Sequence, residues 1–263
     1  QDVFFQLKIA FDSEEAKKIS SRISEEIYYH ALVRSIELAE EFGPHSAFSE
    51  TRAAEGKFQF DLWENAVPQE AKRFEDLRER MVKSGLRNSL MIAIAPTATI
   101  ASIAGCYECI EPQISNLFKR ETLSGEFLQI NSYLVKDLQS EGLWTEAVRD
   151  KIKKAEGSIQ AIDEIPQALR DLYRTVWEVP MRSLIDMAAE RGAFIDQSQS
   201  MNLFMETPTI GKLSSMYMYA FQKGIKTSYY LRSRPATKIR QSTKGASEHA
   251  IKAPDDTVDL ALA

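Results

Sequence analysis

The sequence predicts an α/β fold that is rich in helices and keeps its strands inside. Apolar residues recur at helical spacing over long stretches, whereas residues 89–95 form an almost continuous apolar run between Asn88 and Pro96. Such a run is typical of a strand that is buried on both faces. The other strand candidates lie between helical stretches, which favours a layout with the sheet inside.

Helices are expected where capping residues and stop signals frame an apolar stripe. The first long helix begins after Asp12–Glu15, ends at Gly43-Pro44, and should bury Ile19, Ile23, Ile27, Tyr28, Leu32 and Ile36. A second helix is predicted from Pro68 to Gly85. Further along, N-cap, stop and first-turn signals are given by Asn131, Gly142, Thr145, Gly157, Pro166 and Pro180. The last helix carries Leu213, Met216, Ala220 and Phe221 and ends at Gly224.

The remaining strand candidates are short. Residues 116–130 are expected to form a hairpin, and 201–205 and 226–231 are expected to be strands. Residues 236–263 are rich in Lys, Ser, Thr, Ala and Asp without an apolar period, which indicates a flexible tail or linker. We therefore divide the chain into a folded region, 1–235, and a tail, 236–263.

The composition is that of an ordinary globular chain. Of 263 residues, 44% are hydrophobic, and 33 Lys and Arg stand against 38 Asp and Glu, giving a formal net charge of -5. The apolar content suffices for a substantial core in one large domain or two small ones. The slightly acidic balance argues against a nucleic-acid-binding protein, which would normally be basic.

The cysteine content and the length of the apolar runs restrict the cellular location that we expect. Cys106 and Cys109 are too few for a disulfide framework, and no neighbouring cluster completes a zinc site. A cytoplasmic location fits this pattern. No apolar run reaches the roughly 20 residues needed to span a bilayer, so no membrane partner is expected. Because Gln1 follows neither an initiator Met nor a basic signal-peptide start, we expect the chain to begin inside a longer protein.

The first candidate site is the turn Pro96–Ser102, between the apolar strand and a short helix. Small and hydroxyl residues in such a turn let backbone N–H groups converge on a phosphate, with help from the helix dipole. The alternative is that Thr97 and Thr99 only cap the helix.

The second candidate is the pair Tyr229-Tyr230. Two phenols that are stacked and shielded from water can exchange an electron and a proton. Adjacent strand residues, however, normally face opposite sides of a sheet, which would make one tyrosine a core residue and the other a surface residue.

Five stretches, in order, carry a resemblance to a known family. They are Arg87–Thr99, Ile110–Pro112, Leu123–Phe127, Phe194–Ser198 and Gly224–Arg232. Together they resemble the C-terminal portion of the large (α) subunit of class I ribonucleoside-diphosphate reductases. The resemblance runs from about the first helix to Pro235, and the Pro-Thr-Ala-Thr turn combined with the Lys-Thr-x-Tyr-Tyr stretch is its most specific part.

The resemblance implies a fold and a set of site residues. The fold is the C-terminal part of a helix-rich, ten-stranded α/β barrel made of two antiparallel five-stranded halves. Thr97, Ala98, Thr99 and Ile100 would line the site for the substrate phosphates. Tyr229 and Tyr230 would relay an oxidising equivalent to an active-site cysteine. No residue is expected to bind a metal.

The resemblance also implies an activity and partners. The parent enzyme would reduce ribonucleoside diphosphates to deoxyribonucleoside diphosphates, for DNA synthesis, by cysteine and tyrosine radical chemistry. Its partners would be a small (β) subunit, a second α subunit in a homodimer, and thioredoxin or glutaredoxin acting on a tail that this chain lacks. This chain would hold no cofactor itself. The enzyme would depend on the metal and radical cofactor of the small subunit and on ATP and dNTP effectors.

Some family features are missing. We find neither the loop in which Asn and Glu flank the radical-forming cysteine nor a cysteine after Pro235. We therefore expect a fragment that does not reduce ribonucleotides alone. Cys106 and Cys109 are interpreted as structural or incidental thiols, and Glu111 as a carboxylate that organises the loop behind the phosphate site.

Two alternatives remain open. A non-catalytic nucleotide-binding module would keep the Pro96–Ser102 turn without needing both tyrosines, and a structural or assembly protein would need neither feature. Glycyl-radical enzymes also contain a barrel, but an Arg-x-x-Gly-Tyr type loop is not found near the C-terminus.

Overall fold

The computed structural model describes residues 1–64, 66–122 and 125–234, and the predicted tail 236–263 lies outside these ranges. The first half of the chain contains α1 (Asp2–Leu7), α2 (Glu14–Phe42), the 3-10 turns η1 (Phe48–Glu50) and η2 (Gln59–Leu62), α3 (Ala71–Ser84) and α4 (Ala98–Ala104). The second half contains β1 (Leu117–Thr122), β2 (Gly125–Ile130), α5 (Ser132–Ser140), α6 (Glu146–Lys154), α7 (Gln167–Leu172), α8 (Met181–Gly192), β3 (Leu203–Phe204), α9 (Ile210–Gln222) and β4 (Leu231–Arg232).

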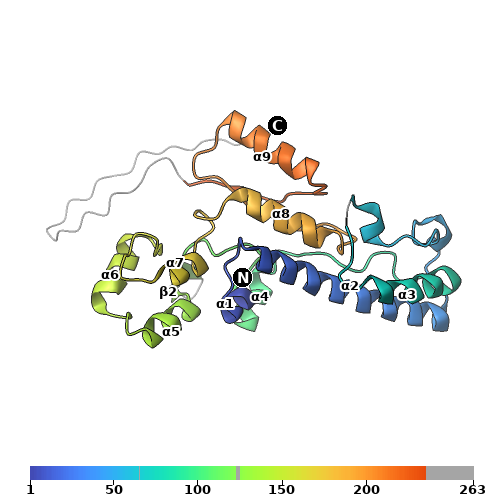
Figure 1. The fold of residues 1–263 in the computed structure, drawn as a ribbon, viewed down its shortest axis with the longest axis horizontal. Helices are drawn as coiled ribbons and strands as arrows, with labels where there is room; N and C mark the ends of the chain where they lie inside the picture. The colour runs from blue at the N-terminus through green and yellow to red at the C-terminus, as the bar shows by residue number, and fades with distance from the viewer. Residues whose placement is uncertain (65, 123–124, 235–263) are drawn as a thin grey trace.

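The helices form a stack with a separate lobe at one end. In Figure 1, α3 lies beside the C-terminal half of α2, α8 lies above α2, and α9 lies above α8. Helices α5, α6 and α7 gather in a lobe at the far end from α3, with their own core around Leu134, Leu138, Ile152 and Tyr173. The extended residues 91–94, which lead to the predicted site, line one hollow together with residues of α2 and α8.

Helix α2 follows its sequence signals closely. The Ser13 hydroxyl accepts the N–H of Ala16, and Gly43 ends the helix with a φ of 79°. Tyr28 is buried as predicted, together with Leu32 and Ile36. The prediction is wrong for Ile23 and Ile27, which are 42% and 52% exposed and face an apolar hollow instead of a packed neighbour.

Helix α3 begins at Ala71 and not at Pro68, because α2 supplies its cap. The buried carboxylate of Glu25 accepts the N–H groups of Gln69 (2.7 Å) and Glu70 (3.1 Å) and pairs with Arg73. These contacts satisfy N–H groups that a helix start leaves without an intrahelical acceptor. The predicted stop at Gly85 is confirmed, with a φ of 82°.

The hairpin predicted for 116–130 is confirmed. Strands β1 and β2 pair antiparallel, with Leu117 opposite Ile130. Asn131 then caps α5, its side-chain oxygen accepting from Tyr133 N and Leu134 N.

Residues 89–95 are extended, but the prediction of a regular strand buried on both faces is wrong. Their one bridge is Ile94 with Gln199, Leu90 is 55% exposed, and Ala93 and Ala95 are also exposed. A fully buried strand needs hydrogen-bonded neighbours on both edges and a layer on each face. Within the described residues this segment has a neighbour on one edge.

That neighbour is the central extended segment, residues 197–205. Its first part bonds to Ile92 and Ile94, because Gln197 N donates to Ile92 O, Ile94 N to Ser198 O and Ser200 N to Ile94 O. Its last part contains β3, which pairs parallel with β4. The strand predicted for 201–205 is therefore present at 203–204. The strand predicted for 226–231 is reduced to Leu231 at its end, followed by Arg232.

The last predicted helix is α9, which packs Met216 and Ala220 against α8 and β3. Phe221 was expected in the same face but is 77% exposed. Among the described helices, none combines the length and the apolar character that crossing a membrane requires.

Candidate functional site

An open groove of about 410 Å³ lies where three extended segments meet. Its walls come from Ala93 and Ile94, from residues 197–200, and from Thr227, Ser228 and Tyr229. The groove therefore brings one of the predicted relay tyrosines beside the segment that leads, three residues later, into the predicted phosphate turn. The sequence separates these two features by more than a hundred residues.

Tyr229 and Tyr230 lie together on the same side of the chain. Their ring centroids are 4.1 Å apart at an interplanar angle of 58°, and the Tyr230 hydroxyl donates to the Tyr229 hydroxyl at 3.4 Å. The neighbouring Tyr230 phenol, through its hydrogen bond and its charge, raises the pKa of Tyr229. The expectation that adjacent tyrosines face opposite sides is wrong, since residues 229–230 precede β4 and do not follow the regular strand alternation.

The two rings are not shielded from water by the described residues. Tyr229 is 54% exposed and Tyr230 is 49% exposed. The Arg232 guanidinium lies 5.1 Å from the centre of the Tyr230 ring, which leaves the pair in contact with a cation but open to solvent. The two tyrosine rings are thus in contact at a tilted angle and are not stacked, and the described residues do not shield them from water.

The predicted phosphate turn has a strained backbone. Thr97 is the N-cap of α4 with φ 55° and ψ 12°, in the left-handed region that β-branched residues avoid. Its side chain makes no capping hydrogen bond, so the simple capping interpretation does not account for this threonine. Ala98, Thr99 and Ile100 form the first turn of α4 and are all exposed. Strain of this kind is concentrated at functional sites in proteins.

Replacing Thr97 with Gly tests the origin of this strain. Glycine adopts the same dihedral angles freely, so we expect Thr97→Gly to stabilise the fold by about 1 kcal/mol. A denaturant titration of the full chain measures this change. A loss of stability would show that the threonine side chain makes contacts that outweigh its backbone strain.

Behind the turn lies a buried polar cluster formed by Glu111, Asn202 and Cys109. The Glu111 carboxylate accepts from Asn202 N at 2.7 Å and from Asn202 Nδ2 at 3.2 Å. Asn202 Nδ2 also donates to Cys109 Sγ at 3.6 Å, and the Cys109 N–H and Sγ both donate to Pro96 O. Glu111 thus ties the loop after α4 to the residue before β3, in agreement with the organising role expected for it.

The two thiols differ in their surroundings. Cys106 is exposed, whereas Cys109 is partly buried, and this burial raises the pKa of its thiol. Both cysteines are free in the structure. In residues 1–64, 66–122 and 125–234, His, Cys, Asp and Glu side chains do not assemble in groups of three or more that could hold a metal ion.

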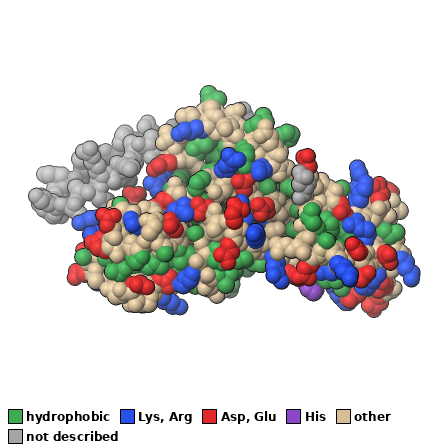
Figure 2. Space-filling view, viewed as in Figure 1, with side chains coloured by type: hydrophobic (Ala, Val, Ile, Leu, Met, Phe, Trp, Pro, Cys, Tyr) green, Lys and Arg blue, Asp and Glu red, His purple; other side chains and the backbone are tan. Residues whose placement is uncertain are grey.

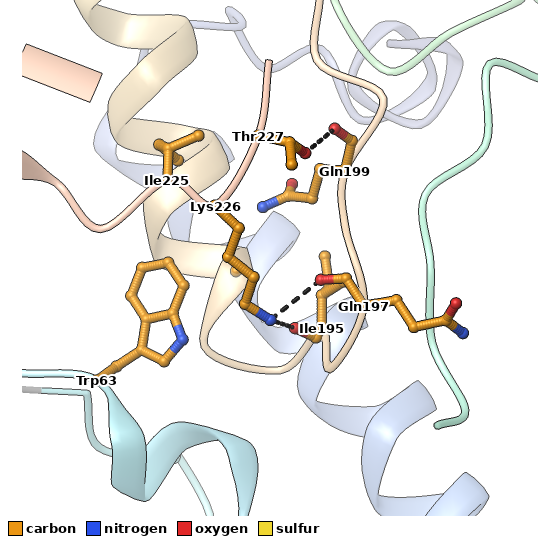
Figure 3. A pocket seen from close by; sticks show the side chains of 8 residues that line it. Trp63, Ile195, Gln197, Gln199, Ile225, Lys226 and Thr227 are labelled. Carbon is orange, nitrogen blue, oxygen red and sulfur yellow. Dashed lines mark hydrogen bonds between the residues drawn. The ribbon is translucent and has the colours of Figure 1, made fainter. Parts of the chain in front are cut away.

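Two residues that the sequence reasoning left without a role join the segments around the groove. The Asp196 carboxylate accepts the N–H groups of Met91 and Ile92, each at 2.8 Å. The Lys226 ammonium donates to three carbonyl oxygens of the turn formed by residues 195–197, and Figure 3 draws the bonds to Ile195 and Gln197. Both residues stand within stretches that carry the family resemblance, but spacing alone does not reveal which carbonyl or N–H group a side chain reaches.

Acidic and basic side chains are interspersed over the face drawn in Figure 2, without a large patch of one sign. An anionic ligand would therefore be held by local groups and not by the overall field of this face.

Comparison with known proteins gives consistent matches. The family model described as "Ribonucleotide reductase, barrel domain" matches residues 1–231. The "Ribonucleoside-diphosphate reductase large subunit" of Dictyostelium discoideum is 48% identical over 244 residues, which cover 92% of this chain and 28% of that protein. The protein of the same name from Acanthamoeba polyphaga mimivirus is 43% identical over 269 residues, covering 98% of this chain and 30% of that protein.

A solved structure is also similar. It is titled "Actinobacillus ureae class Id ribonucleotide reductase alpha subunit", and it superposes with a TM-score of 0.67 at 26% sequence identity. The match covers 89% of this chain and 37% of that structure. This chain spans about 30% of the length of the curated relatives that it matches.

Proposed function

The chain belongs to the ribonucleotide reductase barrel-domain family, and from that membership we propose that it works as part of a ribonucleoside-diphosphate reductase large subunit. Its fold is accordingly a helix-rich part of that barrel. Its share in the reaction is to hold the phosphates of a ribonucleoside diphosphate and to deliver an oxidising equivalent toward the substrate, which is converted to the deoxyribonucleotide.

The phosphates bind at the N-terminal turn of α4. Backbone N–H groups in the first turn of a helix have no intrahelical acceptor and carry partial positive charge. Those of Ala98, Thr99 and Ile100 lie on an exposed turn, and the hydroxyl groups of Thr97 and Thr99 add donors beside them. The hydroxyl of Thr97, which makes no cap bond, is available for this purpose.

The oxidising equivalent passes through Tyr230 and Tyr229. A phenol with a pKa of about 10 must release its proton when it loses an electron near neutral pH. Each oxidised tyrosine is returned to the phenol by taking an electron and a proton from the next group. The separation of 3.4 Å between the two hydroxyl oxygens suits this exchange. Tyr229 lines the groove, and Tyr230 follows it in the chain outside the groove lining.

Partners complete the proposal. The oxidant is the metal and radical cofactor of a small subunit, and the exposure of both rings is consistent with a surface that a partner or another part of the subunit covers. A second large subunit, ATP and dNTP effectors, and thioredoxin or glutaredoxin as reductant belong to the same proposal.

The observation that carries this proposal is the groove, because it joins Tyr229 to the segment that ends in the strained Thr97 turn. The phosphate site is tested in the full large subunit by Ala98→Asp, which places a carboxylate at the first turn of α4. We expect the Kd for a nucleoside diphosphate to rise by at least about 10-fold, from charge repulsion and loss of dipole stabilisation.

The matched control is Ile103→Asp on the same helix. Ile103 is 82% exposed and lies one turn or more away from Ala98, so the same charge there should leave the affinity unchanged. Equal affinities for both variants would contradict the phosphate site. A third outcome favours a non-catalytic nucleotide-binding module. In that case the unsubstituted subunit binds the nucleotide and Ala98→Asp does not, but the unsubstituted subunit shows no turnover with any small subunit.

A further inference from the structure

We propose that Lys226 is a positioning residue that fixes Tyr229 at the edge of the groove, in register with the segment leading to Thr97. The inference deepens the proposed function and rests on it, since it concerns the geometry of the same tyrosine. It arises from hydrogen bonds that converge on the turn formed by residues 195–197.

The Lys226 ammonium is saturated with backbone acceptors. Its Nζ donates to Ile195 O at 2.7 Å, to Gln197 O at 3.0 Å and to Asp196 O at 3.1 Å. In the amide orientation that satisfies both neighbours, the Gln59 side-chain oxygen accepts from Lys226 Nζ at 3.1 Å and from Trp63 Nε1 at 2.9 Å. A cation with this many acceptors holds its own chain segment to the turn more firmly than a neutral donor would.

The space around Lys226 is tight. Figure 3 shows the side chain extending between Trp63 and the 195–197 turn, and the cavity that remains there is about 10 Å³. Trp63 packs directly on Gly192 and Gly224, where an added Cβ would come within 2.8 Å and 3.3 Å of the indole ring. Burial lowers the pKa of Lys226, as expected for an ammonium partly withdrawn from water.

The opposite side of the same turn holds the other wall of the groove. Asp196 binds the N–H groups of Met91 and Ile92 through its carboxylate, and Gln197 N donates to Ile92 O at 3.0 Å. The turn is therefore a common anchor. Lys226 connects it to the tyrosine segment, and Asp196 connects it to the segment that continues to Thr97.

Tyr229 is also held by the backbone around it, because the carbonyl of the next residue, Tyr230, accepts Leu203 N at 2.8 Å. The Tyr229 N–H donates to Met201 O at 2.8 Å, and between this bond and Lys226 the chain is held by Thr227 Oγ1, which donates to Gln199 O at 3.4 Å. The ring itself is half exposed, and its described contact is the Tyr230 ring at 4.1 Å, which belongs to the same segment and moves with it. Loss of the ammonium should let the segment 226–229 shift. The rest of the fold should persist, because water can bind the carbonyl oxygens of residues 195–197 in place of the ammonium.

The test uses Lys226→Met, with Lys223→Met as the matched control. Lys223 stands three residues earlier, and its Nζ pairs with Asp186 on the surface at 3.0 Å, outside the turn. In the full chain, 3-fluorotyrosine at position 229 reports the ring's surroundings by ¹⁹F NMR, and 3-fluorotyrosine at position 133, in the α5–α7 lobe, reports the fold.

We expect Lys226→Met to move or broaden the ¹⁹F resonance at position 229 and to leave that at position 133 unchanged, whereas Lys223→Met changes neither. In the large subunit with its small subunit, kcat should fall by at least about 10-fold at unchanged KM, since misplacement of a reacting group slows the chemical step. If the resonance at 133 also collapses, Lys226→Gln, which keeps a polar side chain, replaces the Met variant in both measurements.

An unchanged resonance at position 229 in a folded Lys226 variant would overturn the inference, whatever the turnover. The proposed function fails separately, if Tyr229→Phe retains turnover. A displaced ring with unaltered kcat would also overturn the positioning role, because the displacement would then have no consequence for the reaction.

Discussion

Tyr229→Phe and Tyr230→Phe are each expected to abolish turnover in the complete enzyme while nucleoside diphosphate binding is retained. Phenylalanine preserves the ring contact at 4.1 Å but has no hydroxyl, so neither the proton nor the electron can be passed on near neutral pH. The measurement is deoxynucleotide formation by the large subunit with its small subunit, alongside the Kd of the substrate.

The control for this prediction is Tyr217→Phe on α9. Tyr217 is 40% exposed and lies away from the groove residues, so its hydroxyl is not part of the proposed route. Turnover near the unmodified level in either the Tyr229 or the Tyr230 variant would contradict the relay. A parallel loss in Tyr217→Phe would mean that tyrosine removal acts through something other than the pair.

Local features of the fold were predictable from the sequence because they depend on neighbouring residues. Asn131 and Thr145 cap the helices that they were expected to cap, since each side chain reaches an N–H group two or three residues ahead. The cap of α2 is Ser13, which lies inside the predicted Asp12–Glu15 motif but one residue after Asp12, the residue with a carboxylate three positions on. The hairpin at 117–130 follows for the same reason, because its pairing partner is the next segment of the chain.

Features that depend on distant contacts were not predictable. The start of α3 is decided by Glu25, which lies some 45 residues earlier in the chain. An apolar run such as 89–95 shows that a segment prefers burial but not whether strands flank it on both edges. The structure pairs this run on one edge through Ile94, and the sequence pattern contains no signal for that outcome.

In the candidate site, too, local features could be predicted from the sequence and distant contacts could not. The residue types in the Thr97 turn indicated phosphate binding as one of two interpretations, and the family resemblance favoured that one. The strain at Thr97 and the contact between Tyr229 and Tyr230 required coordinates. Lys226 is the clearest example, because its role depends on three backbone carbonyl oxygens about 30 residues away. Every residue has such a carbonyl, so the residue types do not show which ones a lysine will reach.

Gly157→Ala is expected to destabilise the α5–α7 lobe strongly. Gly157 has a φ of +88°, and an added Cβ would lie 2.7 Å from Leu117 N and 3.0 Å from Asn116 N, with Ser115 Oγ closer still. The Ser115 hydroxyl lies 2.7 Å from both Leu117 O and Glu156 O, to which its one proton can be donated, and it accepts Leu117 N, so it cannot move aside without losing these contacts. We expect a loss of at least about 3 kcal/mol from steric overlap and backbone strain together.

Gly142→Ala separates these two contributions. Gly142 also has a positive φ, +68°, but nothing lies within 4 Å of the Cβ position. Its substitution should cost only the left-handed backbone strain, about 1 kcal/mol. Amide hydrogen exchange of α5, α6 and α7 measures both variants, because it reports the opening of this lobe separately from the rest of the chain. Equal losses of stability in the two variants would show that the residues around Gly157 shift to accommodate the added methyl group at little cost. The larger loss in Gly157→Ala instead identifies this close approach as what joins the hairpin to the helical lobe.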